Sequence, residues 1–310
     1  MGGADSRHLP VMVAEVVDAL RTVPPGHIVD ATLGAGGHAA ALLDALPEHT
    51  LIGLDRDDAA LELAGQALAR FGSRAVLRRA NFDELGGLGL DGVSGVLFDL
   101  GVSSMQLDDA DRGFSYRAVG PLDMRADRRQ STTAADVVNG YDETSLARLL
   151  ARHGEERFAR RIARAVVAAR PLTTTGQLAD VVREAIPAPA RRRGGHPARR
   201  TFQAIRIEVN GELTTLGATL DRAIDLLVPG GRCVVLAYHS GEDRIVKDRF
   251  VEAETGGCIC PAQLPCVCGA VPRVRLVWRG AHRHGPAELA ANPRSESARL
   301  RAAEKLEVAP

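Results

Sequence analysis

Hydrophobic and polar positions alternate between two patterns over the first hundred residues of the chain. Short apolar runs of four to six residues, typical of buried strands, occur at residues 27–32, 50–55, 75–78 and 95–100. Ala- and Leu-rich stretches with a helical pattern lie between them, for example at residues 61–71. Strands that alternate with helices indicate βαβ units around a parallel sheet. We therefore predict an α/β fold for this part of the chain.

The pattern changes after residue 108, and no strand is expected before about residue 200. Helical patterns occur at residues 145–150, 155–170 and 176–186, and an irregular basic loop is expected at residues 187–197. This stretch therefore predicts a region built of turns and helices alone.

The α/β pattern resumes after residue 201. A helix is expected to about residue 227, followed by a strand at residues 232–238 and a last strand at residues 273–278. The simplest domain organisation is one α/β domain formed by residues 1–107 and 201–310. A helical insertion of residues 108–200 then interrupts it.

Composition narrows the class of protein. The 310 residues are 45% hydrophobic and 25% charged, which is typical of a soluble globular chain. No apolar run approaches the roughly 18 residues of a membrane span, and the first ten residues do not form an apolar signal segment, so we expect a cytoplasmic protein. The sequence leaves open whether the chain forms a homodimer.

The charge is balanced overall but not locally. There are 39 basic and 39 acidic residues, so the net charge indicates no nucleic-acid partner. Residues 125–206, however, contain 17 arginines and no lysine against 8 acidic residues. The predicted helical insertion is therefore the basic part of the chain.

A glycine-rich loop at residues 30–38 (DATLGAGGH) follows the first predicted strand. Glycines let backbone N–H groups approach a ligand closely at the start of the next helix. A dinucleotide fingerprint requires a third glycine where Ala39 stands, whereas an acid four residues before G-x-G, here Asp30 before Gly34, is common in S-adenosylmethionine-dependent methyltransferases. Asp55 ends the second strand and can accept hydrogen bonds from a ribose in either cofactor. The alternative is a tight strand–helix turn without a ligand.

The fourth predicted strand ends at Asp99, where substrates bind in open α/β sheets. A carboxylate there can accept the proton of an amine that attacks a methyl group. Methylation at a ring carbon requires a cysteine nucleophile, and no cysteine is near this strand, so N- or O-methylation is favoured. The alternative is that Asp99 caps the following turn. Enzymes that methylate amines of DNA or protein usually carry Asp/Asn-Pro-Pro-aromatic here, and this chain has Asp-Leu-Gly-Val.

Seven longer strings in the sequence are more specific than a general fold motif. They are DATLGAGGHA at residues 30–39, FDLGVSSMQLDDADRGFSY at 98–116, GPLDMR at 120–125, GEERFARRIARA at 154–165, HPARRTFQAIRIEVN at 196–210, HSGEDRIVK at 239–247 and NPRSESARLRAAE at 292–304. On these strings the chain resembles the family of bacterial 16S ribosomal RNA cytosine-N4 methyltransferases known as RsmH or MraW. The resemblance extends from about residue 8 to residue 304.

The resemblance implies a Rossmann-like class I methyltransferase fold with an inserted helical domain that recognises rRNA. It also implies S-adenosylmethionine as donor, and as acceptor a cytosine amine in the decoding region of 16S rRNA in the small ribosomal subunit. With the glycine-loop analysis, the expected cofactor-binding residues are Asp30, Gly34, Gly36, Gly37, His38, Asp55, Phe82, Asp99 and Gln106. The expected catalytic residues are Asp99, Ser103 and His239. An RNA-binding assembly factor that keeps the fold without turnover is the alternative outside enzymes.

Two of these assignments have structural alternatives. Phe82 can stack against adenine or belong to the core. His239 follows the fifth strand, where a histidine is often structural, and the family string favours a position in the substrate pocket.

Exposed arginines are the candidate RNA contacts. A helix over residues 155–170 would place Arg157, Arg160, Arg161 and Arg164 on one face. That face is either solvated, with Glu156 pairing with Arg160, or a contact for RNA phosphates, which guanidinium groups bind well. The predicted RNA-binding residues are Arg157, Arg161, Arg191, Arg192, Arg193, Arg199 and Arg200.

Four cysteines lie within eleven positions, at Cys258, Cys260, Cys266 and Cys268. Such a cluster can hold a structural zinc ion. The one-residue gaps differ from the usual two-residue spacing and are expected to strain a shared tetrahedron. A plain loop or a redox-labile cluster is therefore favoured. No metal is expected in the methyl-transfer chemistry.

Overall fold

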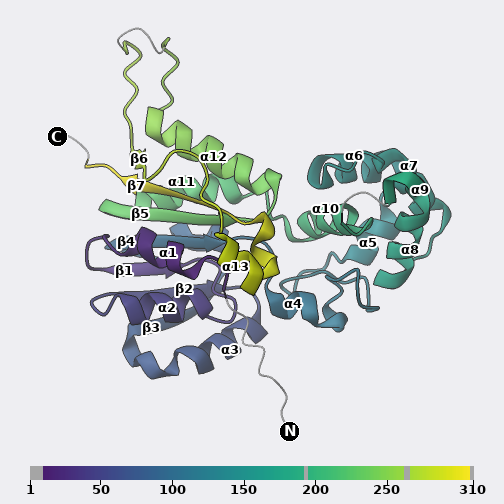
Figure 1. The fold of residues 1–310 in the computed structure, drawn as a ribbon, viewed down its shortest axis with the longest axis horizontal. Coiled ribbons are helices and arrows are strands. Elements are labelled where there is room, and N and C mark those ends of the chain that lie inside the picture. The colour runs from purple at the N-terminus through teal and green to yellow at the C-terminus, as the bar shows by residue number, and fades with distance from the viewer. Residues whose placement is uncertain (1–9, 192–194, 262–265, 308–310) are drawn as a thin grey trace. The chain divides into compact units, whose positions relative to one another are not determined.

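The computed structural model describes residues 10–191, 195–261 and 266–307. The chain folds into two compact units (Figure 1). The first, here called the sheet unit, is formed by Met1–Gly101 and Leu213–Pro310, and the second, the helical unit, by Val102–Glu212. Residues 108–200, the expected insertion, fall inside the helical unit. No helix in the described ranges is long and apolar enough to cross a membrane.

The sheet unit contains a seven-stranded, mostly parallel sheet. The strands are β1 (His27–Asp30), β2 (Thr50–Asp55), β3 (Ala75–Arg79), β4 (Val93–Asp99), β5 (Leu227–Ala237), β6 (Val274–Leu276) and β7 (Arg299–Lys305). Their order is β3-β2-β1-β4-β5-β7-β6. Strands β1 to β5 pair in parallel, and β7 is antiparallel to both β5 and β6. The predicted α/β class and the five predicted strands of the parallel part are confirmed.

Helices cover both faces of the sheet because its strands alternate buried side chains between them. Val96 and Phe98 of β4 belong to one core and Leu97 to the other. The first core is completed by α11 (Leu216–Leu226) and α12 (Ser240–Thr255), and the second by α1 (Val13–Leu20), α2 (Gly37–Ala45) and α3 (Asp58–Leu68). The remaining helices of this unit are α13 (Pro286–Ala291) and the 3-10 segments η1 (Ala69–Arg74), η2 (Phe82–Gly87) and η4 (Pro293–Ser297).

The strand expected at residues 273–278 is confirmed as β6, but the expectation that it is the last strand is wrong, because the unpredicted strand β7 follows it. Its sequence alternates arginines with Leu300 and Ala302, which are buried. Arg299 and Arg301 both bind the carboxylate of Asp243, each with a shortest N–O distance of 2.7 Å. These ion pairs neutralise the arginines and let the segment lie next to β5.

The helical unit has its own core, formed by residues 114–209. Its helices are α4 (Ser104–Asp108), α5 (Ala134–Gly140), α6 (Glu143–Gly154), α7 (Ala159–Ala168), α8 (Thr175–Ala185), α9 (Ala188–Arg191), α10 (Arg199–Asn210) and the 3-10 turn η3 (Ala110–Arg112). No strand longer than a single bridge, between Pro121 and Thr174, occurs among the residues described in this unit.

Two predicted helices have different boundaries in the structure. The helix expected at residues 155–170 begins only at Ala159, because Glu155 adopts a left-handed conformation (φ 47°) that ends α6. The single helix expected from residue 201 to about 227 is two helices, α10 and α11. Gly211, with φ 61°, ends the first of them.

Candidate cofactor and catalytic site

Four side chains lie at the carboxyl ends of neighbouring strands of the sheet unit. Asp30 ends β1, Asp55 ends β2, Asp99 ends β4, and Tyr238 directly follows β5. In the sheet β1 lies between β2 and β4, and the chain order reverses direction there. Ligands of open α/β sheets bind at this kind of switch point, beyond the carboxyl ends of the strands.

The glycine loop has the close approaches that require glycine. Gly36 has φ 81°, and a Cβ there would lie 3.3 Å from Cβ of Ala64. A Cβ on Gly37 would lie 2.4 Å from Cγ of Pro10. Gly34, at φ 54°, differs because its added Cβ would meet only the Thr32 carbonyl oxygen, at 4.0 Å. The loop therefore packs on one side and leaves bare backbone at Gly34 on the other.

Asp55 connects the glycine loop to β2. Its Oδ2 accepts a 2.9 Å hydrogen bond from the Gly34 amide, and its Oδ1 accepts one of 2.9 Å from the Asp57 amide. Burial raises the pKa of the Asp55 carboxyl, although these two N–H groups act in the opposite direction. Each oxygen keeps a further lone pair, so the carboxylate can still accept hydrogen bonds from a ligand.

Asp30 is a buried carboxyl group, with 1% of the residue exposed. Its Oδ1 accepts a 3.2 Å hydrogen bond from the Thr32 amide. Burial raises its pKa to about 7, and the attraction of His38 only partly offsets the cost of burying the charge. A cationic ligand group beside Asp30 would favour the charged form of this carboxyl.

His38, at the start of α2, joins the glycine loop to the end of β4. Its Nε2 lies 2.9 Å from the Val11 carbonyl oxygen, which can only accept, so Nε2 carries a hydrogen. Its Nδ1 lies 3.4 Å from Oδ2 of Asp99. Burial lowers the pKa of this imidazole, but the hydrogen bond and charge of Asp99, with Asp30, outweigh it, and the net shift is upward. The protonated ring can donate to Asp99 and to Val11 together.

Asp99 has a donor at each carboxylate oxygen. Oδ1 accepts a 2.7 Å hydrogen bond from the Tyr238 hydroxyl, and Oδ2 faces His38. The Asp99 amide donates to the Thr32 hydroxyl at 2.6 Å, which fixes the end of β4 against the end of β1. The side chain is 26% exposed, so a substrate can still reach the carboxylate. This arrangement fits a carboxylate that accepts a proton.

Sequence reasoning missed Tyr238 and Thr32, although both contact Asp99. Tyr238 is partly buried, and loss of solvent around the phenol, together with the nearby Asp99 charge, raises its pKa well above the ordinary value, so the phenol remains a donor. Its position at the end of a predicted strand beside β4 was the available signal. Thr32 lies inside the glycine string, and nothing in its spacing indicates a contact with Asp99.

Phe82 begins η2, after β3. Its ring packs edge-on against Phe98, with ring centroids 6.3 Å apart and an interplanar angle of 79°. Phe82 is only half-buried, so part of the ring remains available to a ligand. This observation is compatible with both predicted roles, core packing and adenine stacking.

His239 caps the N-terminus of α12. Its Nδ1 accepts from the amides of Gly241 (3.2 Å) and Glu242 (3.4 Å), and its Nε2 lies 3.1 Å from the Glu242 carboxylate. The side chain is 10% exposed. These contacts make His239 the N-cap of α12, and its expected catalytic role remains a prediction.

Ser103 and Gln106 cap α4, within the helical unit. The Gln106 amide donates to Oγ of Ser103 at 3.3 Å, and the Ser103 amide donates to Oε1 of Gln106 at 3.1 Å. This reciprocal pair is a capping box. Their expected catalytic and cofactor roles remain predictions.

Sequence comparisons identify the family of this chain. The profile of the MraW methylase family matches residues 5–306. The chain belongs to this family. It is 55% identical to the ribosomal RNA small subunit methyltransferase H of Acidothermus cellulolyticus, over 96% of this chain and 94% of that protein. It is 51% identical to the enzyme of the same name from Saccharopolyspora erythraea, over 99% of this chain and 96% of that protein. The predicted resemblance is confirmed.

The arginines expected at the RNA surface occupy different settings in this MraW family member. Arg161 lies on the exposed face of α7, beside Arg160 and Arg164, whereas Arg157 precedes the helix and stacks over Phe158, 4.9 Å from the ring centroid. The expectation that all four arginines share one helical face is therefore wrong for Arg157.

The predicted ion pair between Glu156 and Arg160 is also wrong. Glu156 is buried, and its Oε1 accepts a 2.9 Å hydrogen bond from the Phe158 amide. The carboxylate thus helps to start α7, and Arg160 stays on the exposed face of the helix.

The second group of arginines lies around α9 and α10. Arg191 donates to the carbonyl oxygens of Ile186 (2.7 Å) and Glu184 (3.3 Å), and so helps to end α8. Arg199 and Arg200 are exposed at the start of α10, and Arg200 donates to the Glu155 carbonyl oxygen at 3.0 Å. Two further predicted contacts, Arg192 and Arg193, lie outside the described residues.

Proposed function

We propose that this protein transfers a methyl group from S-adenosylmethionine to the exocyclic N4 amine of a cytosine in the decoding region of small-subunit ribosomal RNA. Family membership supports methyl transfer, and the name shared by its relatives supports small-subunit rRNA as the acceptor. The observation that carries the choice of an amine is the partly exposed Asp99 carboxylate, held by Tyr238 and His38 at the end of β4.

The residues at the carboxyl edge of the sheet fit the chemical groups of this cofactor. Asp55 offers oxygens to ribose hydroxyls, and the half-buried ring of Phe82 offers a face to adenine. The bare backbone at Gly34 lets a ligand come close. The methionine part of the cofactor is cationic at its ammonium and sulfonium groups, and Asp30 supplies a buried carboxyl that gains from a neighbouring positive charge.

The chain's own residues position the acceptor and remove its proton. The bound cofactor supplies an electrophilic methyl group on a sulfonium centre. Asp99 accepts a hydrogen bond from the amine and thereby orients the nitrogen for in-line attack. Once the nitrogen has bonded to carbon it holds one proton too many, and Asp99 or water takes that proton. Tyr238 and His38 keep the carboxylate in place during this step.

The helical unit is proposed to bind the rRNA backbone. Arginine forks bind phosphate in a bidentate manner, and Arg161, Arg199 and Arg200 are exposed on α7 and α10. Arg157, Arg191, Arg192 and Arg193 complete the proposed set. A target cytosine stacked in a helix has to leave its stack before its amine can reach a buried site. Partly assembled or locally opened subunits are therefore the expected substrates.

The test combines purified protein, labelled S-adenosylmethionine and small subunits that lack the modification. The RNA is then digested and its nucleosides are separated by mass spectrometry. Label in N4-methylcytidine supports the proposal. Subunits first saturated with unlabelled methyl groups by the same enzyme are the matched control and should take up no label.

Two other outcomes contradict the proposal in different ways. Label in another nucleoside would keep the methyl-transfer chemistry but overturn the assignment of the acceptor. Tight cofactor binding without label in any subunit preparation would favour an assembly factor that binds RNA without turnover.

A further inference from the structure

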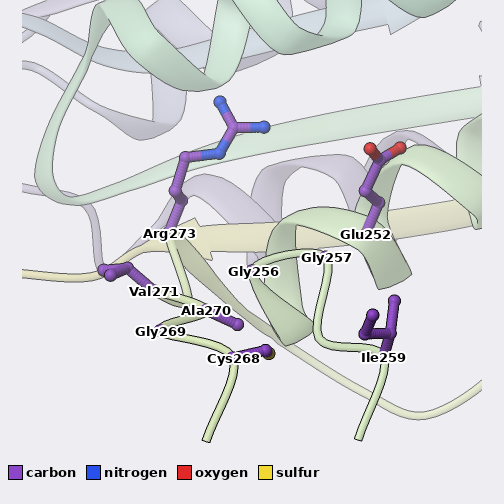
Figure 2. A pocket seen from close by; sticks show the side chains of 9 residues that line it. All are labelled: Glu252, Gly256, Gly257, Ile259, Cys268, Gly269, Ala270, Val271 and Arg273. Atoms are coloured by element: carbon purple, nitrogen blue, oxygen red, sulfur yellow. The ribbon is translucent and has the colours of Figure 1, made fainter.

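The chain between α12 and β6 forms an extension with two arms that run side by side away from the sheet (Figure 1). The arms are joined tightly at their base. A Cβ on Gly256, which has φ 63°, would lie 2.4 Å from the carbonyl carbon of Val271. The Arg273 amide donates to the Ala253 carbonyl oxygen at 2.8 Å. Figure 2 shows this base, with Gly256 and Gly257 on one arm and Ala270 and Val271 on the other.

Among the described residues beyond this base, the large hydrophobic side chains are exposed and do not pack between the arms. Ile259 on one arm is 89% exposed, and Val267 on the other is 88% exposed. The described residues of the extension contain neither a helix nor a strand between α12 and β6. Irregular segments of this length are uncommon in compact domains unless they have a function or another source of order.

The four clustered cysteines lie just beyond the base, two on each arm. Cys258 and Cys260 come from the outgoing arm, and Cys266 and Cys268 from the returning arm. The Sγ atoms of Cys258 and Cys266 are 3.5 Å apart, as are those of Cys266 and Cys268, and Cys268 lies 3.7 Å from Cys258. All four Sγ atoms lie within 4.8 Å of one another.

The three distances among Cys258, Cys266 and Cys268 are close to the edges of a tetrahedron around zinc. A Zn–S bond is about 2.3 Å long, so neighbouring sulfurs of a regular ZnS4 site are about 3.8 Å apart. The one-residue gaps do not keep the four sulfurs apart, because the two cysteines of each arm face the two cysteines of the other arm. The extension thus brings two C-x-C pairs to one point.

Backbone N–H groups also point at the sulfurs. The Val267 amide donates to Sγ of Cys260 at 3.5 Å. The amides of Ile259 and Ala270 also hydrogen-bond to Cys268. Such N–H···S contacts commonly surround thiolate ligands and orient them toward a metal.

We propose that Cys258, Cys260, Cys266 and Cys268 bind one Zn²⁺ ion that fixes the extension. Binding forms four Zn–S bonds, and the thiols release their protons to solvent. Four protein ligands leave no open position for water or substrate, so the ion is structural and takes no part in methyl transfer. Thiolates in a tetrahedral set select zinc over magnesium or calcium, and iron is the competitor that the experiment separates.

The test measures metal content in the full-length chain without a metal-affinity tag. The protein is produced in zinc-supplemented medium, purified without chelator and analysed by inductively coupled plasma mass spectrometry. One zinc ion per chain is expected. The double variant Cys258→Ser, Cys268→Ser is expected to retain less than about a tenth of this zinc, because two of four thiolates are lost. Cys233→Ala, which removes the fifth cysteine from the core of the sheet unit, should keep the full zinc content.

A second measurement reports the geometry directly. Cobalt(II) exchanged into the wild-type site should give the visible d–d bands of a tetrahedral ion and intense sulfur-to-cobalt charge transfer. Both signals should be absent from the double variant, whose far-ultraviolet circular dichroism should match the wild type. Iron in place of zinc, equal zinc in wild type and double variant, or wild-type protein without bound metal would each overturn the proposal.

Discussion

The hydroxyl of Tyr238 donates a 2.7 Å hydrogen bond to Oδ1 of Asp99, across 139 residues of sequence. It forms because β4 and β5 are parallel neighbours, with Asp99 paired opposite Leu236. Tyr238 is partly buried, and desolvation raises its pKa well above the ordinary value, so the hydroxyl keeps its proton. The phenol thus holds one oxygen of a carboxylate that remains accessible to substrate.

Removing this hydroxyl should slow methyl transfer more than it weakens cofactor binding. A hydrogen bond to a charged group contributes about 1.5–3 kcal/mol, so Tyr238→Phe should lower kcat by about 10- to 100-fold. Asp99→Asn removes the proton acceptor itself and should lower kcat by roughly 10²- to 10⁴-fold. Steady-state kinetics with small subunits measure both effects.

Tyr141→Phe is the matched control for this prediction. The Tyr141 hydroxyl also donates a 2.7 Å hydrogen bond to a carboxylate, that of Glu208, but within the helical unit. Its kcat should remain within about twofold of the wild type, because only the contact to Asp99 acts on the proton acceptor. Wild-type kcat in Tyr238→Phe would exclude the positioning role.

Gly34 should be needed for cofactor binding, and not because a side chain at this position would clash in the folded protein. Gly34→Ala places a Cβ at φ 54° with no atom closer than 4.0 Å, so the cost to stability is about 1–2 kcal/mol of backbone strain. Gly89→Ala is matched, because Gly89 has φ 60° and no neighbour within 4 Å. Urea denaturation should show similar losses in both variants. Isothermal titration should show weakened S-adenosylmethionine binding only in Gly34→Ala, and equal affinities would argue against the loop as the cofactor site.

Asp30 should make stability depend on pH in a specific direction. The pKa of its carboxyl is 3.8 in the unfolded chain and about 7 in the folded protein. Between about pH 4 and pH 7 the folded protein therefore binds more protons than the unfolded chain. The contribution of Asp30 to the free energy of unfolding is therefore most favourable below about pH 4 and is lost as the pH rises to about 7.

The substitution Asp30→Asn removes this penalty and tests it. The variant should gain stability over the wild type progressively from pH 4 to 7, reaching about 2–4 kcal/mol, and the gain should level off above pH 7. The same variant should bind S-adenosylmethionine more weakly, because it lacks the carboxylate. Urea denaturation across this pH range, with the exposed Asp91→Asn as control, measures the effect. A gain that is constant with pH would contradict it.

Arginines of the helical unit should set the salt dependence of RNA binding. Each phosphate contact contributes roughly 0.7–0.9 to the slope of log K against log salt concentration. Arg161→Gln and Arg199→Gln should each lower this slope by about that amount. Binding to an rRNA fragment at several salt concentrations measures it. Arg21→Gln, which removes the exposed arginine that follows α1 in the sheet unit, should leave the slope unchanged. A slope unaffected in all three variants would exclude the proposed contacts.

Local sequence patterns predicted the parallel strands, the residues at the edge of the sheet and the family of this protein. The apolar runs predicted the parallel strands β1 to β5, because a strand that is buried on both faces consists of consecutive apolar residues. The glycine string with Asp30 and Asp55 marked the carboxyl edge of the sheet, and Asp99 marked the end of β4. Long, specific strings were sufficient to identify the family. Each of these signals is contained within a few neighbouring residues.

Contacts between residues that are distant in sequence could be seen only in the tertiary structure. Strand β7 exists because Arg299 and Arg301 find Asp243, more than fifty residues away. The Nδ1 atom of His239 caps α12, and the Tyr238 hydroxyl contacts Asp99 because β5 lies beside β4. The four cysteines, whose spacing argued against a metal, meet because two arms fold back on each other. Sequence periodicity records which residues are buried, whereas which buried or polar groups meet is fixed by the packing of the whole chain.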